Sequence, residues 1–127
     1  MVYVQLRDIV AYRLYNLVMD RNTLQQTISI FNHAIRVTSQ QWAHITEAHD
    51  YMSGNLDMVL ETVSEPEQVI EGKAGASIAL RSYAKTNISQ KTAVVIYRDE
   101  PDGFVITAFL TSKPDKITRQ GHNLWPT

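Results

Sequence analysis

The sequence predicts an α+β fold in which N-terminal helices precede a four-stranded antiparallel β-sheet meander. Its 127 residues have the length of one domain. Apolar side chains recur every three or four residues in the first half, as in helices, and alternate with polar ones from Gln68 onward, as in strands. Turn-forming residues at Gly75, Asn87 and Pro101–Gly103 separate the strands. Helices followed by a run of strands are typical of this class.

Two apolar stripes with helical spacing occupy the first 35 residues. They are Leu6, Val10, Leu14 and Leu17, then Leu24, Ile28, Phe31 and Ile35. A break at Asp20–Asn22 divides them, so two helices are predicted. The β-branched run over residues 27–30 leaves an extended conformation open for the second stripe.

Two further helices are predicted between residues 38 and 66. Thr38 and Gln41 have the spacing of a capping box, which predicts that a helix begins just after Thr38. The run Ser53–Asn55 ends it. A second amphipathic stripe, ended by Pro66, consists of Leu56, Val59, Leu60 and Val63.

Four strands are expected near Val69, Ile78–Tyr83, Ala93–Tyr97 and Val105–Leu110. Their alternation predicts that one face of the sheet packs on the helices, using Ile78, Leu80, Ser82, Phe104, Ile106, Ala108 and Leu110. The outer face would then carry Arg81, Tyr83, Lys85, Thr107, Phe109 and Thr111. Arginine, aromatic and hydroxyl side chains on one exposed face suit a phosphate and a stacked base.

Composition excludes several classes of protein. The formal charge of −1 does not indicate a nucleic-acid binder or a polybasic membrane module. Cysteine is absent, which excludes disulfides and thiolate metal sites and fits a reducing, cytoplasmic location. Charges at Arg7, Asp8 and Arg13 interrupt the apolar N-terminus, so neither a signal peptide nor a membrane span is expected. Charge is nevertheless uneven, since an acidic middle precedes a basic end.

The segment WAHITEAHDYMSGNLDMVLETVSEPEQVIEG, followed by IALRSYAKT, TAVVIYRDE, DGFVITAFLTSKPDKI and NLW, resembles the phage-type group of the barnase-EndoU-colicin-RelE nuclease superfamily. The helix motif HIxxxH and the strand motif ITAFxT carry the resemblance, which covers roughly residues 36–125. It implies two parts, a helical N-terminal extension over 1–35 and a nuclease domain over 36–127. It also implies a curved antiparallel sheet packed on helices.

The activity implied by the resemblance is that of a metal-independent endoribonuclease of the toxin or phage-effector type. Such an enzyme cleaves RNA when a ribose 2′-hydroxyl attacks the adjacent phosphate. The implied catalytic residues are His44, Arg81, Thr107 and Tyr83, and the implied substrate-binding residues are Lys85, Thr111, Phe109 and His49. The expected partners are RNA and a small antitoxin or inhibitor protein, and a homodimer would form through the N-terminal helices.

The residues themselves leave other interpretations open. His44 and His49 are five residues apart, a rotation of ~140° on a helix, so they do not form a zinc pair, and neither metal nor cofactor is expected. His49 shares a stripe with Ile45 and Met52, which favours a structural role. Arg81 could simply pair with a nearby carboxylate. A non-enzymatic interaction or regulatory module on the same fold is therefore the competing hypothesis, and a metal-dependent hydrolase is the third.

Overall fold

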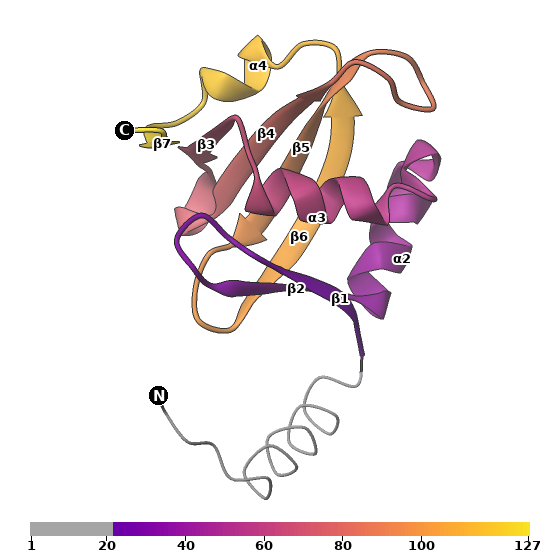
Figure 1. Ribbon diagram of the computed structural model, residues 1–127, viewed down its shortest axis with the longest axis horizontal. Helices are drawn as coiled ribbons and strands as arrows, with labels where there is room; N and C mark the ends of the chain where they lie inside the picture. Colours follow the sequence, from indigo (N-terminus) through magenta and orange to yellow (C-terminus); the bar gives the residue numbers. More distant parts are fainter. Residues whose placement is uncertain (1–21) are drawn as a thin grey trace, which may run out of the picture.

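One seven-stranded mixed sheet organises the chain (Figure 1). The structure is a computed structural model that describes residues 22–127. The strand order is β1-β2-β6-β5-β4-β3-β7. The strands are β1 (Thr23–Ile28), β2 (Ala34–Thr38), β3 (Gln68–Glu71), β4 (Ser77–Tyr83), β5 (Lys91–Arg98), β6 (Gly103–Thr111) and β7 (Asn123–Trp125). The helices are α2 (Ser39–Ala48), α3 (Leu56–Ser64) and α4 (Asp115–Thr118).

The predicted architecture is wrong, although the chain is α+β. Strands β3 to β6 do form an antiparallel meander in the predicted order. Three further strands extend it, however, because β7 pairs with β3 and the β1–β2 hairpin joins through β2, which runs parallel to β6. The sheet is therefore mixed and seven-stranded instead of antiparallel and four-stranded.

The second predicted N-terminal helix is also wrong. Residues 23–38 form the antiparallel hairpin of β1 and β2, in which Ile28 pairs with Ala34 and Thr27 with Ile35. The spacing of four between Leu24 and Ile28 fits one face of a strand as well as a helix, and the β-branched residues of this stretch favour the strand. The predicted boundary between residues 35 and 36 falls inside β2, and the predicted helix over residues 6–17 lies outside the described residues.

The predicted start of the helix after Thr38 and the end of the next helix before Pro66 are confirmed, but α2 ends at Ala48, before the predicted break at Ser53–Asn55. The side-chain oxygen of Thr38 accepts a hydrogen bond from the backbone nitrogen of Gln41 at 3.1 Å and caps α2. A 3₁₀ turn over Asp50–Met52 follows α2, and α3 ends two residues before Pro66.

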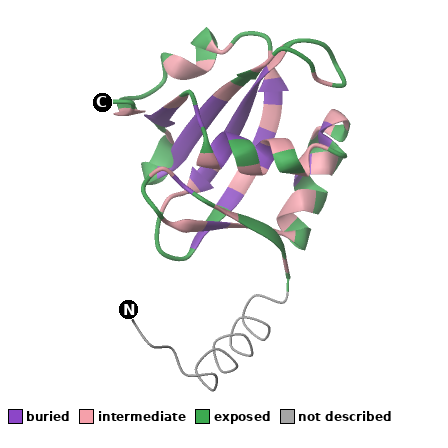
Figure 2. Ribbon diagram, viewed as in Figure 1, coloured by how far each residue is buried: buried purple, intermediate pink, exposed green. Residues whose placement is uncertain are grey.

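The sheet is covered on two sides (Figures 1 and 2). We call the side that packs on α2 and α3 the helix face and the opposite side the far face. The helix-face core joins Ile45, Met52, Val59 and Val63 to strand residues that include Ile35, Val37, Ala79, Val95, Ala108 and Leu110. On the far face Ile117 of α4 packs on Ile70, Ile78, Leu80 and Val94.

The predicted facing of β4 is reversed. Ile78 and Leu80 lie on the far face, whereas Ala79, Arg81 and Tyr83 lie beneath α3. Both faces of the meander carry apolar side chains, so alternation alone does not decide which face meets the helices.

The register between β5 and β6 shifts between Ile96 and Tyr97, which changes the face of the sheet on which the β6 side chains lie. Ala108 and Leu110 pack on the helices as predicted, but Val105 joins them and Phe104 is exposed. A bulge of this kind inserts one residue into a strand and reverses the alternation beyond it.

Candidate functional site

The structure does not bring the predicted catalytic residues together. His44 is exposed on α2. Arg81 lies on the helix face, and Thr107 lies on the far face, where it pairs with Ile96. A single phosphate cannot contact Arg81 and Thr107 from opposite sides of a sheet. His44, Arg81 and Thr107 therefore do not line one cleft.

Arg81 and Tyr83 are engaged by α3 and the residue that follows it. The Arg81 guanidinium donates to the carbonyl oxygen of Glu65 at 2.6 Å, and its Nε lies 3.4 Å from the Glu61 carboxylate. The Tyr83 hydroxyl donates to the same carboxylate at 2.6 Å. Burial, followed by the hydrogen bond to Glu61, raises the pKa of Tyr83 to about 12. A phenol with that pKa keeps its proton at neutral pH and can therefore donate the hydrogen bond to Glu61. Through these contacts Arg81 and Tyr83 hold α3 on the sheet.

His49 is placed quite differently, at the edge of β6. It is the residue that ends α2, and its backbone nitrogen donates to the carbonyl oxygen of Ile45 at 2.8 Å. The imidazole ring lies 5.8 Å from the ring of Phe109, centroid to centroid, and 5.6 Å from the ring of Tyr51. Its Nδ1 lies 3.3 Å from the Tyr51 hydroxyl. The ring is therefore held against the far-face row of β6.

Three predicted site residues form that row. Thr107, Phe109 and Thr111 project from the far face of β6 and pair across to Ile96, Val94 and Thr92 of β5. Alternate residues of a strand lie about 7 Å apart, so Thr111 is the next far-face neighbour of Phe109. His49, Phe109 and the two threonines therefore share one surface. Lys85 lies in the loop after β4, and its side chain is exposed. None of the described contacts places it on the surface that His49, Phe109 and the threonines share.

A row of three hydroxyls crosses the sheet at the end of this surface. Ser82 pairs with Thr92, and Thr92 pairs with Thr111, so the side chains from β4, β5 and β6 lie side by side. They line a hollow of about 430 Å³. The remaining lining residues are Gln90, Lys91, Ser112 and Pro114. Hydroxyls and one basic residue around an open hollow are suited to an anion such as a phosphate.

A second hollow, of about 260 Å³, adjoins the first and shares Ser82, Thr92 and Pro114 with it. Its other lining residues are Glu67, Gln68, Leu80, Asp115 and Thr118. Two carboxylates and the side of a leucine give it a different chemistry from the hydroxyl-lined hollow.

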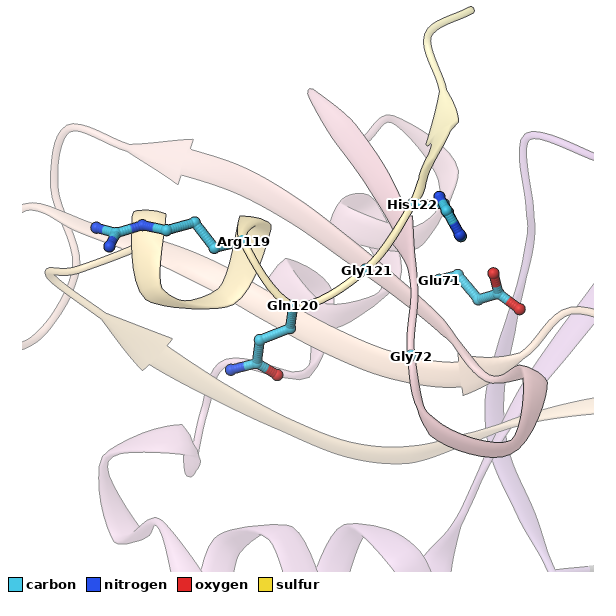
Figure 3. A pocket seen from close by; sticks show the side chains of 6 residues that line it. All are labelled: Glu71, Gly72, Arg119, Gln120, Gly121 and His122. Atoms are coloured by element: carbon cyan, nitrogen blue, oxygen red, sulfur yellow. The ribbon is translucent and has the colours of Figure 1, made fainter.

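A third hollow, of about 410 Å³, lies where the chain leaves α4 and passes Glu71 (Figure 3). Figure 3 shows that the side chains of Arg119 and His122 point in different directions from this segment. Gly121 approaches Glu71 so closely that an added Cβ would lie 1.9 Å from the Glu71 carbonyl oxygen. The side chains that line the hollow therefore do not converge on one ligand.

His33 forms a polar cluster far from this surface. Its Nδ1 lies 2.7 Å from the Asp99 carboxylate, and the Ser29 hydroxyl donates to the same oxygen at 2.7 Å. Asp99 follows the opposite end of β5 from Thr92. The cluster links the β1–β2 turn to the meander. Nowhere in residues 22–127 do three potential ligands among His, Asp and Glu gather as a metal site.

Sequence reasoning missed Ser82, Thr92, Lys91 and Ser112. The signal that could have found them is the hairpin register, because hydroxyl residues stand at the ends of three consecutive strands. Aligning the strands across their turns would have put Ser82, Thr92 and Thr111 in one row.

Comparisons with protein-family models, with curated proteins and with solved structures find no match to this chain. None of the helices in the described part of the chain is long and apolar enough to cross a membrane.

Proposed function

We propose that the chain is a metal-independent endoribonuclease that cleaves RNA by transesterification from the 2′-hydroxyl. The observation that carries the proposal is the position of His49, whose ring lies 5.8 Å from Phe109 on the strand that leads to the hydroxyl-lined hollow. The resemblance of residues 36–125 to the barnase-EndoU-colicin-RelE nucleases supports the same reaction. In this proposal RNA is the substrate, and the enzyme acts in the cytoplasm.

Four residues, His49, Phe109, Thr111 and Tyr51, have defined roles in the proposal. The His49 imidazole takes the proton from the ribose 2′-hydroxyl, because histidine is the side chain best suited to proton transfer near neutral pH. The 2′-oxygen then bonds to the phosphorus as the P–O5′ bond breaks, and the leaving 5′-oxygen takes a proton from water, which gives a 2′,3′-cyclic phosphate end. Phe109 stacks on a base. Thr111 and its neighbours in the hollow hold the phosphate oxygens as negative charge develops. Tyr51 orients the imidazole through its hydroxyl.

His44 gives the matched control for the test. Both histidines lie at α2, but His44 is exposed and has no hydrogen bond, ion pair or ring contact with a far-face residue among those described. Mixed RNA in a chelating buffer is incubated with wild type, His49→Ala and His44→Ala. We expect cleavage that leaves 2′,3′-cyclic phosphate ends, a loss of about 10² to 10⁴-fold for His49→Ala, and near wild-type rates for His44→Ala. Equal losses in the two variants would remove His49 from the mechanism.

A non-enzymatic interaction module is the second candidate, and exposed apolar side chains favour it. Leu24, Ile28, Phe31 and Phe104 are between 38% and 49% exposed, and all come from the part of the chain around β1, β2 and the start of β6. An exposed apolar patch is typical of a protein interface. Such a surface would suit a partner such as a small inhibitor protein. The absence of RNA cleavage by wild-type protein, with or without added metal, would put this candidate first.

A further inference from the structure

We propose that the two adjoining hollows bind a single nucleotide and select its base. The phosphate would lie in the hydroxyl-lined hollow. Its base, distinct from the base that Phe109 stacks on, would lie in the hollow lined by Glu67 and Asp115, which favours bases that carry an exocyclic amino group over uracil. This inference rests on the proposed function and assigns its substrate preference.

Thr92 is the first reason to expect a ligand. The residue is only 8% exposed and lines both hollows. Its hydroxyl has no hydrogen-bond partner among residues 22–127. The hydroxyl oxygen itself is not fully buried, so a polar group that enters either hollow can contact it as a hydrogen-bond partner.

The charges of the two hollows are complementary to the two ends of a nucleotide. The hydroxyl-lined hollow contains Lys91 and no acidic residue. The adjoining hollow contains Glu67 and Asp115 and no basic residue. A phosphate is therefore favoured in the first and excluded from the second by like charge. The shared wall of Ser82, Thr92 and Pro114 places the two subsites next to each other.

The carboxylates decide which base fits. An ionised carboxylate is only an acceptor, so it pairs with a ligand group that donates a hydrogen bond. Asp115 has no hydrogen bond or ion pair from its side chain within the described residues. Glu67 already accepts one hydrogen bond from the backbone nitrogen of Ser82, which fixes the carboxylate at the hollow. Cytosine, adenine and guanine present an amino group, as cytosine N4 does to Asp or Glu, whereas uracil presents a carbonyl oxygen in the same place.

Cytidine and uridine 3′-monophosphates are the sharpest pair of probes, because they differ mainly in the amino group and carbonyl at position 4 of the base. Binding of each to the full chain is measured by calorimetry and by NMR shifts. We expect cytidine monophosphate to bind about tenfold more tightly, since a matched polar contact discriminates by about 1–3 kcal/mol. The same ratio is expected in His49→Ala, since binding does not need proton transfer.

Three variants test which residues produce the preference for cytidine monophosphate over uridine monophosphate. Asp115→Ala should reduce the ratio to about one, and the exposed Glu47→Gln on α2 should leave it unchanged. Thr92→Val, which keeps the shape of the side chain, should weaken both nucleotides. Equal binding of the two nucleotides to wild type, or an unchanged ratio in Asp115→Ala, would overturn the inference. A ratio near ten without RNA cleavage would retain the subsite and refute the nuclease, whereas cleavage without any base preference would do the reverse.

Discussion

The hydroxyl of Tyr51 lies 3.3 Å from the backbone nitrogen of Leu110 and 3.5 Å from its carbonyl oxygen. The contact lies on β6 beyond its short pairing with β2, which involves only Gly103 and Phe104. The Gln41 side chain reaches the same strand and donates to the carbonyl oxygen of Ile106. Side chains from α2 and the turn after it thus complete an edge that would otherwise expose unpaired backbone.

Tyr51→Phe should therefore have two effects. It removes the contacts to Leu110 and to Nδ1 of His49 while keeping the aromatic ring. We expect a loss of about 1 kcal/mol in the free energy of unfolding, measured with urea. RNA cleavage should fall further than this loss of stability explains, because the imidazole loses its orienting partner. Normal cleavage in a variant with reduced stability would show that Tyr51 serves the strand edge alone.

The pair of His33 and Asp99 should couple strongly. Asp99 has a nearly buried side chain, 6% exposed, and accepts hydrogen bonds from His33 and Ser29. A double-mutant cycle with His33→Ala and Asp99→Ala should give a coupling energy of about 1–3 kcal/mol in urea unfolding. RNA cleavage should scale only with the folded fraction, because the pair lies at the far end of β5. An additive cycle would mean that the short contact contributes nothing to stability.

Gly103→Ala should disturb the parallel pairing of β2 with β6. An added Cβ would lie 2.3 Å from the carbonyl oxygen of Arg98 and 2.6 Å from Cδ1 of Ile35. Relief of that overlap should cost about 1–3 kcal/mol in thermal or urea unfolding. Gly72→Ala is the control, because its Cβ would meet only the side chain of Ile78 at 3.1 Å and the carbonyl oxygen of Ala76 at 3.5 Å. Equal losses in the two variants would contradict this account.

Local signals predicted the meander well because neighbouring residues determine it. The alternation over residues 78–83 and the turn at Pro101–Gly103 follow from the chain itself. The cap at Thr38 is equally local, although Gln41 uses its side chain for Ile106 instead of completing the capping box. The parallel pairing of β2 with β6 joins residues about 70 positions apart, so no local pattern indicates it.

The candidate site was half predictable for a related reason. His49, Phe109, Thr107 and Thr111 were identified and share a surface, because β6 alternates and α2 ends beside it. Arg81 was misplaced because its partners are supplied by α3, and the choice of which sheet face receives α3 depends on packing across the whole domain. Strand alternation shows which residues share a face of the sheet, but it does not show which of the two faces packs on the helices.

Alkaline pH should destabilise the protein through Tyr83. Its pKa is about 12 in the folded chain, against an ordinary value of 10. Between these values the unfolded phenol releases its proton while the folded one keeps it, so the unfolded state binds fewer protons and the free energy of unfolding falls as pH rises. The contribution should be complete below pH 10 and lost by about pH 12. Burial raises the pKa of Tyr97 as well, so the wild type contains both effects.

Tyr83→Phe separates the two tyrosines. Urea unfolding of the variant from pH 9 to pH 12 should show a shallower decline than that of wild type, because only the Tyr97 phenol still resists ionisation. At pH 7 the variant should lose some stability through the missing hydrogen bond to Glu61. RNA cleavage per folded molecule should stay unchanged, since the hydroxyl faces α3 and not the far-face row. Parallel declines in the two proteins would mean that Tyr83 ionises equally easily folded and unfolded, and that Glu61 and burial do not hold its proton.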